Sequence, residues 1–206
     1  SSRGSKVVKR GVLRAGRGSQ AGAYTCAAWV QMQEGEPLLV LGTSQGAVHA
    51  YVAGSSKKAW DVAEAMGTGA FAALRVLNEP EGLLVAASAD GVCIMDCTEG
   101  AMLQSIPFPA KQKKKGAPSC LAVAHGGDVV LVGHAGGLQL FQGSPLKSRW
   151  NSGELGGPPG AAAFSPCGQY FAFSETGSSV VRIVKFEVKK HGRGFSTIVH
   201  GVGKFD

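Results

Sequence analysis

Leu38-Leu-Val-Leu-Gly-Thr-Ser-Gln-Gly-Ala-Val-His-Ala-Tyr51 joins two short apolar runs through a glycine turn. The same pattern recurs at 83–95, 129–141 and 170–184. Short apolar runs bounded by turn residues predict strands, so each copy predicts a β-hairpin. The spacings between successive turn glycines are 45, 46 and 40 residues, a period typical of four-stranded propeller blades. These glycines are Gly46, Gly91, Gly137 and Gly177.

A further short apolar strand is predicted before each hairpin. A weaker apolar patch at Met102–Ile106 follows the second hairpin and predicts an outer strand. The preceding strands are predicted at 24–30, 70–76, 119–124 and 160–165. Trp60 and Trp150 occupy comparable connections, where an aromatic side chain can cover the edge between adjacent blades. The sequence also suggests one helical turn over Asp61–Met66 and a further strand beginning within Phe195–Val199.

The predicted fold class is therefore all-β, a β-propeller with about four four-stranded blades. Propellers commonly contain about four to eight blades, so four are few for a closed ring. We expect this chain to form part of a larger propeller or to be completed by another segment. With 44% hydrophobic residues the chain can build a substantial core.

The net charge of +7 is concentrated at the N-terminus, where residues 1–20 carry six basic side chains and no acid. Such a segment buries too little apolar surface to fold alone, so it predicts a disordered or partner-ordered arm, with the partial propeller over 21–206. Its cations can neutralise nucleic-acid phosphates, although a solvated tail or a nuclear-localisation signal fits equally well. The candidate contacts are Arg3, Lys6, Lys9, Arg10, Arg14 and Arg17.

A second basic cluster lies in the connection between the predicted second and third blades. It lies within Lys111-Gln-Lys-Lys-Lys115, between prolines at 107, 109 and 118, and predicts an exposed loop. A short lysine run is often only a soluble loop, but it can also contact nucleic acid. The candidate contacts here are Lys111, Lys113, Lys114 and Lys115.

Catalytic and metal-binding patterns do not emerge from the sequence. There is neither a Gly-x-Ser-x-Gly nucleophile elbow nor a phosphate-binding glycine loop before a helix, so we expect no enzyme activity, no cofactor and no small-molecule substrate. The histidines do not cluster with carboxylates and are interpreted as structural or surface residues. The five cysteines are interpreted as reduced core residues and not as a zinc site: Cys26, Cys93, Cys97, Cys120 and Cys167.

No run of about 18 apolar residues suggests a membrane span, and no secretory signal is visible, so a cytosolic or nuclear location is expected.

Three stretches resemble the turns and strands of WD-repeat blades: Trp29, Phe164-Ser-Pro-Cys-Gly168 and Ser88-Ala-Asp-Gly91. The resemblance covers about 24–186. However, the usual Trp-Asp dipeptide is missing from the repeat ends, which implies degenerate blades held together by packing.

A narrower resemblance is to the WD-repeat subunits of the small-subunit processome, particularly the Utp5-type nucleolar subunit of the UtpA subcomplex. Tyr24-Thr-Cys-Ala-Ala-Trp29 and Leu38-Leu-Val-Leu-Gly-Thr-Ser-Gln-Gly46, with Tyr51, carry it. It implies a non-enzymatic scaffold in nucleolar ribosome biogenesis and pre-rRNA processing, which contacts other protein subunits and pre-ribosomal RNA. The alternatives are a cytoplasmic adaptor of a cytoskeletal, trafficking or ubiquitin-ligase assembly, or a propeller enzyme.

Overall fold

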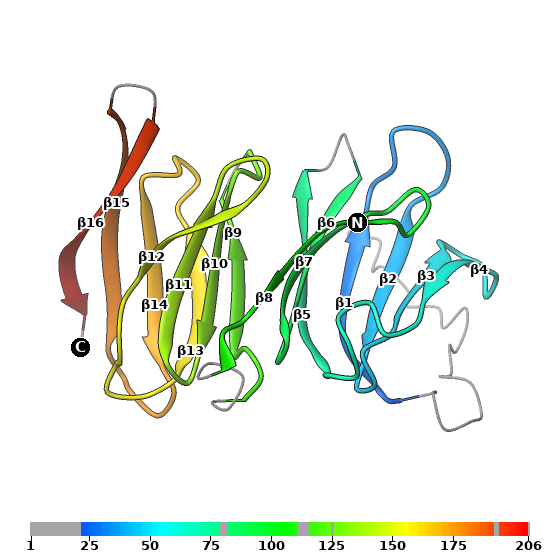
Figure 1. Ribbon diagram of the computed structural model, residues 1–206, viewed down its shortest axis with the longest axis horizontal. Coiled ribbons are helices and arrows are strands. Elements are labelled where there is room, and N and C mark those ends of the chain that lie inside the picture. The colour runs from blue at the N-terminus through cyan, green and yellow to red at the C-terminus, as the bar shows by residue number, and fades with distance from the viewer. Residues whose placement is uncertain (1–21, 79–81, 111–115, 125, 192–193, 206) are drawn as a thin grey trace, which may run out of the picture.

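The computed structural model describes residues 22–78, 82–110, 116–124, 126–191 and 194–205, and within these ranges the chain forms sixteen strands (Figure 1). The first two blades comprise β1 (Tyr24–Val30), β2 (Leu38–Thr43), β3 (Val48–Val52), β4 (Lys58–Val62), β5 (Phe71–Asn78), β6 (Leu83–Ser88), β7 (Gly91–Asp96) and β8 (Met102–Pro107). The last two comprise β9 (Cys120–Val123), β10 (Val129–His134), β11 (Gly137–Gln142), β12 (Lys147–Asn151), β13 (Pro159–Phe164), β14 (Tyr170–Glu175), β15 (Val181–His191) and β16 (Gly194–Phe205).

These strands form four separate antiparallel sheets of four strands, and each sheet follows the order of the chain. We number the sheets as blades 1 to 4. This arrangement confirms the predicted all-β class and the repeat of strand, hairpin and outer strand. Met102–Ile106 lies in β8 as expected, and Phe195–Val199 lies in β16.

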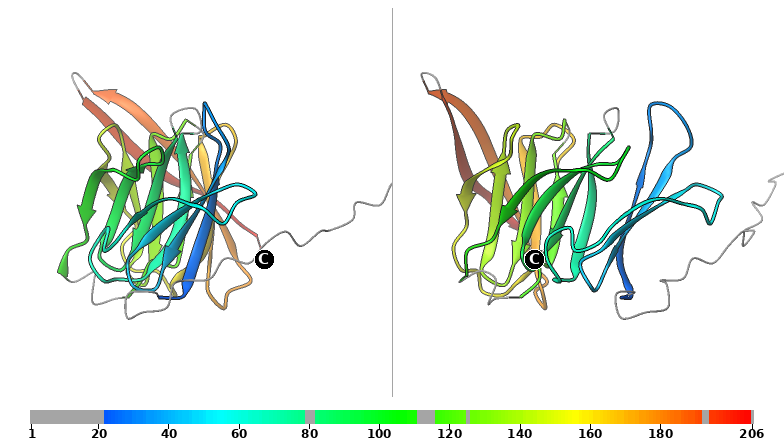
Figure 2. Two further views of the ribbon diagram at one scale, coloured as in Figure 1. Left: turned by 90° about the vertical axis from the view of Figure 1, so that its right-hand side faces the viewer. Right: turned by 45° about the vertical axis from the view of Figure 1, so that its right-hand side comes forward.

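The blades stack in sequence order through their first strands. β1 contacts β5, β5 contacts β9, and β9 contacts β13. One hydrophobic cluster fills each of the three contacts between neighbouring blades. Figures 1 and 2 place blade 1 and blade 4 at opposite ends of this row.

Burial along the strands follows from this stacking. In the middle blades, β10 is buried at every position and β6 at all but its first, because a neighbouring blade covers each face of the sheet. In β1 and β13 most positions alternate between half-buried and exposed, because only one face of each end blade is covered. Within the part of the chain that the structure describes, no further blade covers the two outer faces of the row.

The turn glycines of the four hairpins all have positive φ angles, as their role in tight turns requires. At Gly46, where φ is 77°, a Cβ atom would also collide with the Gly67 carbonyl oxygen. The Thr43 hydroxyl completes this turn by accepting the Ala47 N–H at 3.0 Å.

The helical turn expected over Asp61–Met66 is wrong. Asp61 and Val62 are the last residues of β4, and a turn follows in which Glu64 has a positive φ of 51°. Because this short apolar and acidic segment pairs with β3, through Val48 opposite Val62, sheet pairing prevails over its local helical preference.

Candidate interaction surfaces

The basic residues singled out in the sequence lie outside the described residues. The structure therefore does not place them relative to the blades, and their role stays a prediction. They are Arg3, Lys6, Lys9, Arg10, Arg14, Arg17, Lys111, Lys113, Lys114 and Lys115.

The outer face of blade 1 presents large apolar and aromatic side chains. Trp29 on β1 is 60% exposed, although its neighbour Val30 is completely buried against blade 2. The strand register pairs Trp29 with Leu39 and Leu39 with Tyr51, so these three residues lie side by side on one face, where Leu39 is half-buried and Tyr51 is buried. We call this surface the blade 1 end face.

Three ring side chains form a polar group on the same end face. The Tyr24 hydroxyl lies 2.9 Å from the Tyr51 hydroxyl and 3.4 Å from His49 Nδ1. Burial lowers the pKa of His49, and the Lys58 ammonium lowers it further. Burial and the hydrogen bond to Tyr51 raise the pKa of Tyr24. These pKa shifts favour the neutral forms of His49 and Tyr24. Neutral groups cost less to desolvate than ions when a partner covers this face.

Two alanines and one isoleucine lie side by side on the outer face of blade 4. The register places Ala163 opposite Ala172 and Ala172 opposite Ile183, on the side away from the cluster that joins blade 4 to blade 3. Ala163 is exposed, and the other two are half-buried. At the margin of this blade Arg182 pairs with Glu175 at 2.9 Å. We call this surface the blade 4 end face.

Sequence reasoning did not identify either end face. In Tyr24–Val30 the residues of both faces are mostly small or apolar, so the pattern does not distinguish a strand covered on both sides from one covered on a single side. Trp29 belongs to the residues that carry the family resemblance, and only its place at the end of the row explains why it is exposed.

The cysteine prediction is confirmed in part. Cys93, Cys97 and Cys120 are buried and Cys26 is half-buried, but Cys167 is exposed because it lies in the turn between β13 and β14. Burial raises the pKa of both the Cys93 and Cys97 thiols to about 12, which keeps them protonated and unreactive. At Cys167 a hydrogen bond with Ser165 lowers the pKa of the thiol.

The histidine interpretation is also supported where the structure describes side chains. His134 is buried at the end of β10, and its Nδ1 atom accepts the Gly136 N–H at 2.9 Å, which is a structural role in the hairpin turn. Within the described ranges, no group of three or more His, Cys, Asp or Glu side chains is arranged to hold a metal ion. Over the same ranges, no helix has the length and apolar character needed to cross a membrane.

Comparisons with known proteins identify the fold class. The computationally designed Ika4 protein matches with a TM-score of 0.63 and 16% identity, over 86% of this chain and 98% of Ika4. The Cps50 (Swd1) β-propeller domain of Myceliophteria thermophila matches with a TM-score of 0.65 and 14% identity, over 88% of this chain. The chain is therefore an array of β-propeller blades.

The match spans only 57% of the Swd1 domain structure, so the chain corresponds to little more than half of that propeller. At these identities the likeness establishes the fold and nothing further. No protein-family model matches the sequence. No curated protein matches it either.

Proposed function

We propose that this chain is a non-enzymatic scaffold whose four blades form part of a larger propeller ring. The observation that carries the proposal is the pair of uncovered end faces. Trp29 is 60% exposed beside the half-buried Leu39, with Tyr51 buried next to them, and an exposed indole is suited to packing against another blade. A propeller fold with such faces is consistent with a protein that assembles other proteins.

We further propose that the assembly is a nucleolar precursor of the small ribosomal subunit. The support is the resemblance carried by Tyr24–Trp29 and Leu38–Gly46, whose residues form β1, β2 and the turn into β3. The basic arm adds sequence-independent affinity for pre-ribosomal RNA, because each phosphate contact made by Lys or Arg releases condensed counterions. An adaptor of a cytoplasmic assembly is the alternative outcome.

Two measurements on the tagged chain in cells test this proposal. Fluorescence microscopy is expected to place it in the nucleolus, and affinity purification is expected to recover small-subunit precursor RNA and proteins. Exclusion from the nucleolus, together with recovery of cytoskeletal, trafficking or ubiquitin-ligase subunits, would establish the adaptor instead.

The arm is tested by replacing Arg10, Arg14 and Arg17 with Ser. The variant is expected to bind precursor RNA more weakly and with a shallower salt dependence, by up to about 0.7 in the logarithmic slope for each lost contact to a single strand. A matched variant with Ser5, Ser19 and Gln20 replaced by Ala keeps all the charges and is expected to bind as the parent does. An unchanged salt slope in the arginine variant would contradict the arm's contact with RNA.

A further inference from the structure

The hairpin of β15 and β16 extends beyond the rest of blade 4. The pairing of β14 with β15 ends at Lys185, whereas the pairing of β15 with β16 continues to His191 opposite Gly194. Among the described residues, the last five residue pairs of this hairpin therefore have no third strand beside them. A strand rises about 3.4 Å per residue, so this part is about 17 Å long. We call it the hairpin extension, residues 187–191 and 194–198, and Figure 2 shows the end of the hairpin standing clear of the other blades.

Charge is distributed unequally between this hairpin and the blades before it. β15 and β16 contain five Lys and Arg residues against a single Glu, whereas residues 21–180 contain nine Lys and Arg against twelve Asp and Glu. The basic character thus belongs to the hairpin and not to the blades as a whole. Such a separation of charge directs an anionic partner to the hairpin.

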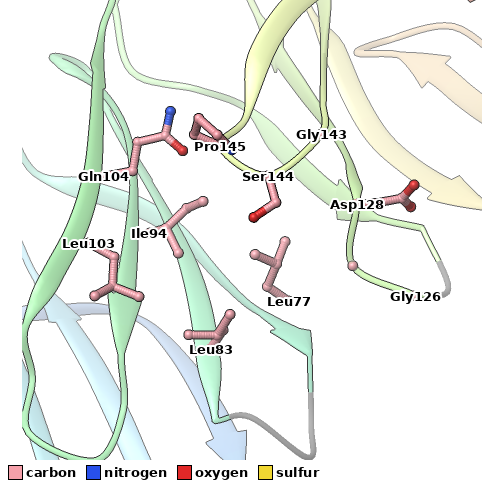
Figure 3. Close-up of a pocket in the computed structure, with 11 residues that line it drawn as sticks. Leu77, Leu83, Ile94, Leu103, Gln104, Gly126, Asp128, Gly143, Ser144 and Pro145 are labelled. Atoms are coloured by element: carbon pink, nitrogen blue, oxygen red, sulfur yellow. The ribbon is translucent and has the colours of Figure 1, made fainter. Parts of the chain in front are cut away.

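The pocket between blades 2 and 3 shows the opposite charge. It has a volume of about 390 Å³, and the described residues that line it include Gln104 and Asp128 but no Lys or Arg. Figure 3 shows the Asp128 carboxylate turned away from the apolar side chains of Leu77 and Leu83. A pocket with a carboxylate and without a cation in its lining repels an anion. An anionic partner therefore favours the hairpin over this pocket.

The register of the hairpin extension places a cation beside an aromatic residue. Lys190 lies opposite Phe195, and Lys189 lies opposite Ser196. Residues directly opposite in an antiparallel pair share a face, and successive residues of a strand alternate between the two faces. Each face of the extension therefore has one of these lysines, and Phe195 belongs to the face of Lys190.

Lysine together with an aromatic residue is a combination with which proteins bind single-stranded nucleic acid. The cation neutralises phosphates and releases condensed counterions, and the ring stacks on a base of any kind. Double-stranded RNA suits this hairpin less well, because side chains cannot read its deep and narrow major groove. An acidic peptide would pair with the lysines but would have no base to stack on the ring.

We propose that the hairpin extension binds single-stranded RNA, with Lys189 and Lys190 contacting phosphates and Phe195 stacking on a base. This inference rests on the proposed function and adds to it a second element that contacts RNA. The basic arm precedes blade 1, whereas the hairpin belongs to blade 4 at the opposite end of the row (Figure 1). The contributions of the arm and the hairpin to RNA binding can therefore be measured separately.

Fluorescence anisotropy of the full chain with a labelled oligouridylate of about 12 nucleotides, over a range of salt concentrations, tests the lysines. Replacing Lys189 and Lys190 with Ser is expected to reduce the logarithmic salt slope by up to about 0.7 for each lost phosphate contact. Arginine at both positions keeps the charge and should preserve the parental slope. Replacing Lys57 and Lys147 with Ser removes the same charge from exposed positions in blades 1 and 3, and it too should preserve the slope.

A parental slope in the variant that lacks Lys189 and Lys190 would overturn the proposal. If that variant also associates with itself more strongly than the parent does, the lysines protect the edges of the hairpin strands instead.

Phe195→Ser separates RNA from an acidic protein as the partner. It is expected to weaken oligouridylate binding at least about fivefold without changing the salt slope, because it removes a stacked ring and no charge. Phe195→Tyr keeps the ring and should bind as the parent does. Trp29→Ser removes an exposed ring from the opposite end of the row and should also bind as the parent does.

If Phe195→Ser binds like the parent, the stacking is wrong. If polyglutamate in addition displaces the labelled RNA as readily as unlabelled oligouridylate does, the partner is an acidic protein and the proposal is overturned. The circular dichroism of each variant shows whether the β-sheet is retained.

The hairpin and the arm are distinguished by combining their variants. If both contact RNA, the losses of slope from the Lys189 and Lys190 changes and from the Arg10, Arg14 and Arg17 changes should add, because the two sites are distant. A loss confined to the arm variant would overturn the hairpin proposal alone. These assays use only the chain and an oligonucleotide, so a nucleolar location could fail while RNA binding succeeds, or the reverse.

Discussion

Gly46 and Gly177 have nearly identical left-handed backbones, with φ of 77° and 78°, in very different surroundings. A Cβ atom at Gly46 would collide with the Gly67 carbonyl, whereas nothing lies within 4 Å of a Cβ atom at Gly177. The sequence predicted both as turn glycines from the repeat. The sequence did not show that Gly46 is crowded and Gly177 is not, because the segment that contacts Gly46 comes from the connection after β4.

We therefore expect alanine to be tolerated unequally at these two glycines. Gly177→Ala carries only the backbone cost of a non-glycine residue in the left-handed region, about 1–2 kcal/mol. Gly46→Ala adds the collision and should lower the free energy of unfolding by about 2–4 kcal/mol. Urea unfolding of both variants measures this difference, and equal losses would show that the contact with Gly67 is unimportant.

The cysteines give a second prediction at the residue scale. Iodoacetamide at mildly alkaline pH should modify Cys167 first, because it is exposed and a hydrogen bond with Ser165 lowers its pKa. Cys93 and Cys97 should react only after unfolding, since burial raises their pKa to about 12. Mass spectrometry of the native and the urea-treated chain follows each site. Modification of native Cys93 as fast as Cys167 would contradict the blade packing.

At the scale of the strand, the sequence predicted most of the fold. Apolar runs and turn glycines placed all four hairpins and the strands before them, because strand pairing within a blade is local in the chain. The exposure of Trp29 and the pocket beside Gln104 could not be predicted, since both depend on contacts between blades. The equivalence of Trp60 and Trp150 was visible in the sequence, but the position of Gln104 between them became clear only from the strand register.

The junction between blades 1 and 2 yields a prediction for these outer strands. Trp60→Ala should destabilise the chain by about 2–4 kcal/mol, because it removes an indole packed on Gly100 and the hydrogen bond to Cys97. Trp60→Phe keeps much of the packing and should cost less, with about 1 kcal/mol from the lost hydrogen bond. Chemical unfolding of the two variants measures both losses. If Trp60→Ala unfolds like the parent, the indole does not hold the blades together.

At the scale of the whole molecule, four blades form a row in which each junction has its own hydrophobic cluster and both ends are open. The blade 1 end face offers bulky side chains around Trp29, and the blade 4 end face offers small ones around Ala163 and Ala172. Among the described residues neither face has a neighbouring blade, which is consistent with the proposed role of a scaffold within a larger ring.

Sedimentation velocity of the chain over a wide range of concentrations, compared with Trp29→Lys, tests directly whether the array of blades is open at its ends. The parent should associate through its end faces as the concentration rises, and Trp29→Lys should associate less while keeping the β-sheet circular dichroism of the parent. A parent chain that sediments as a single monomeric species at every concentration, unfolds cooperatively and is unaffected by Trp29→Lys would contradict the open array.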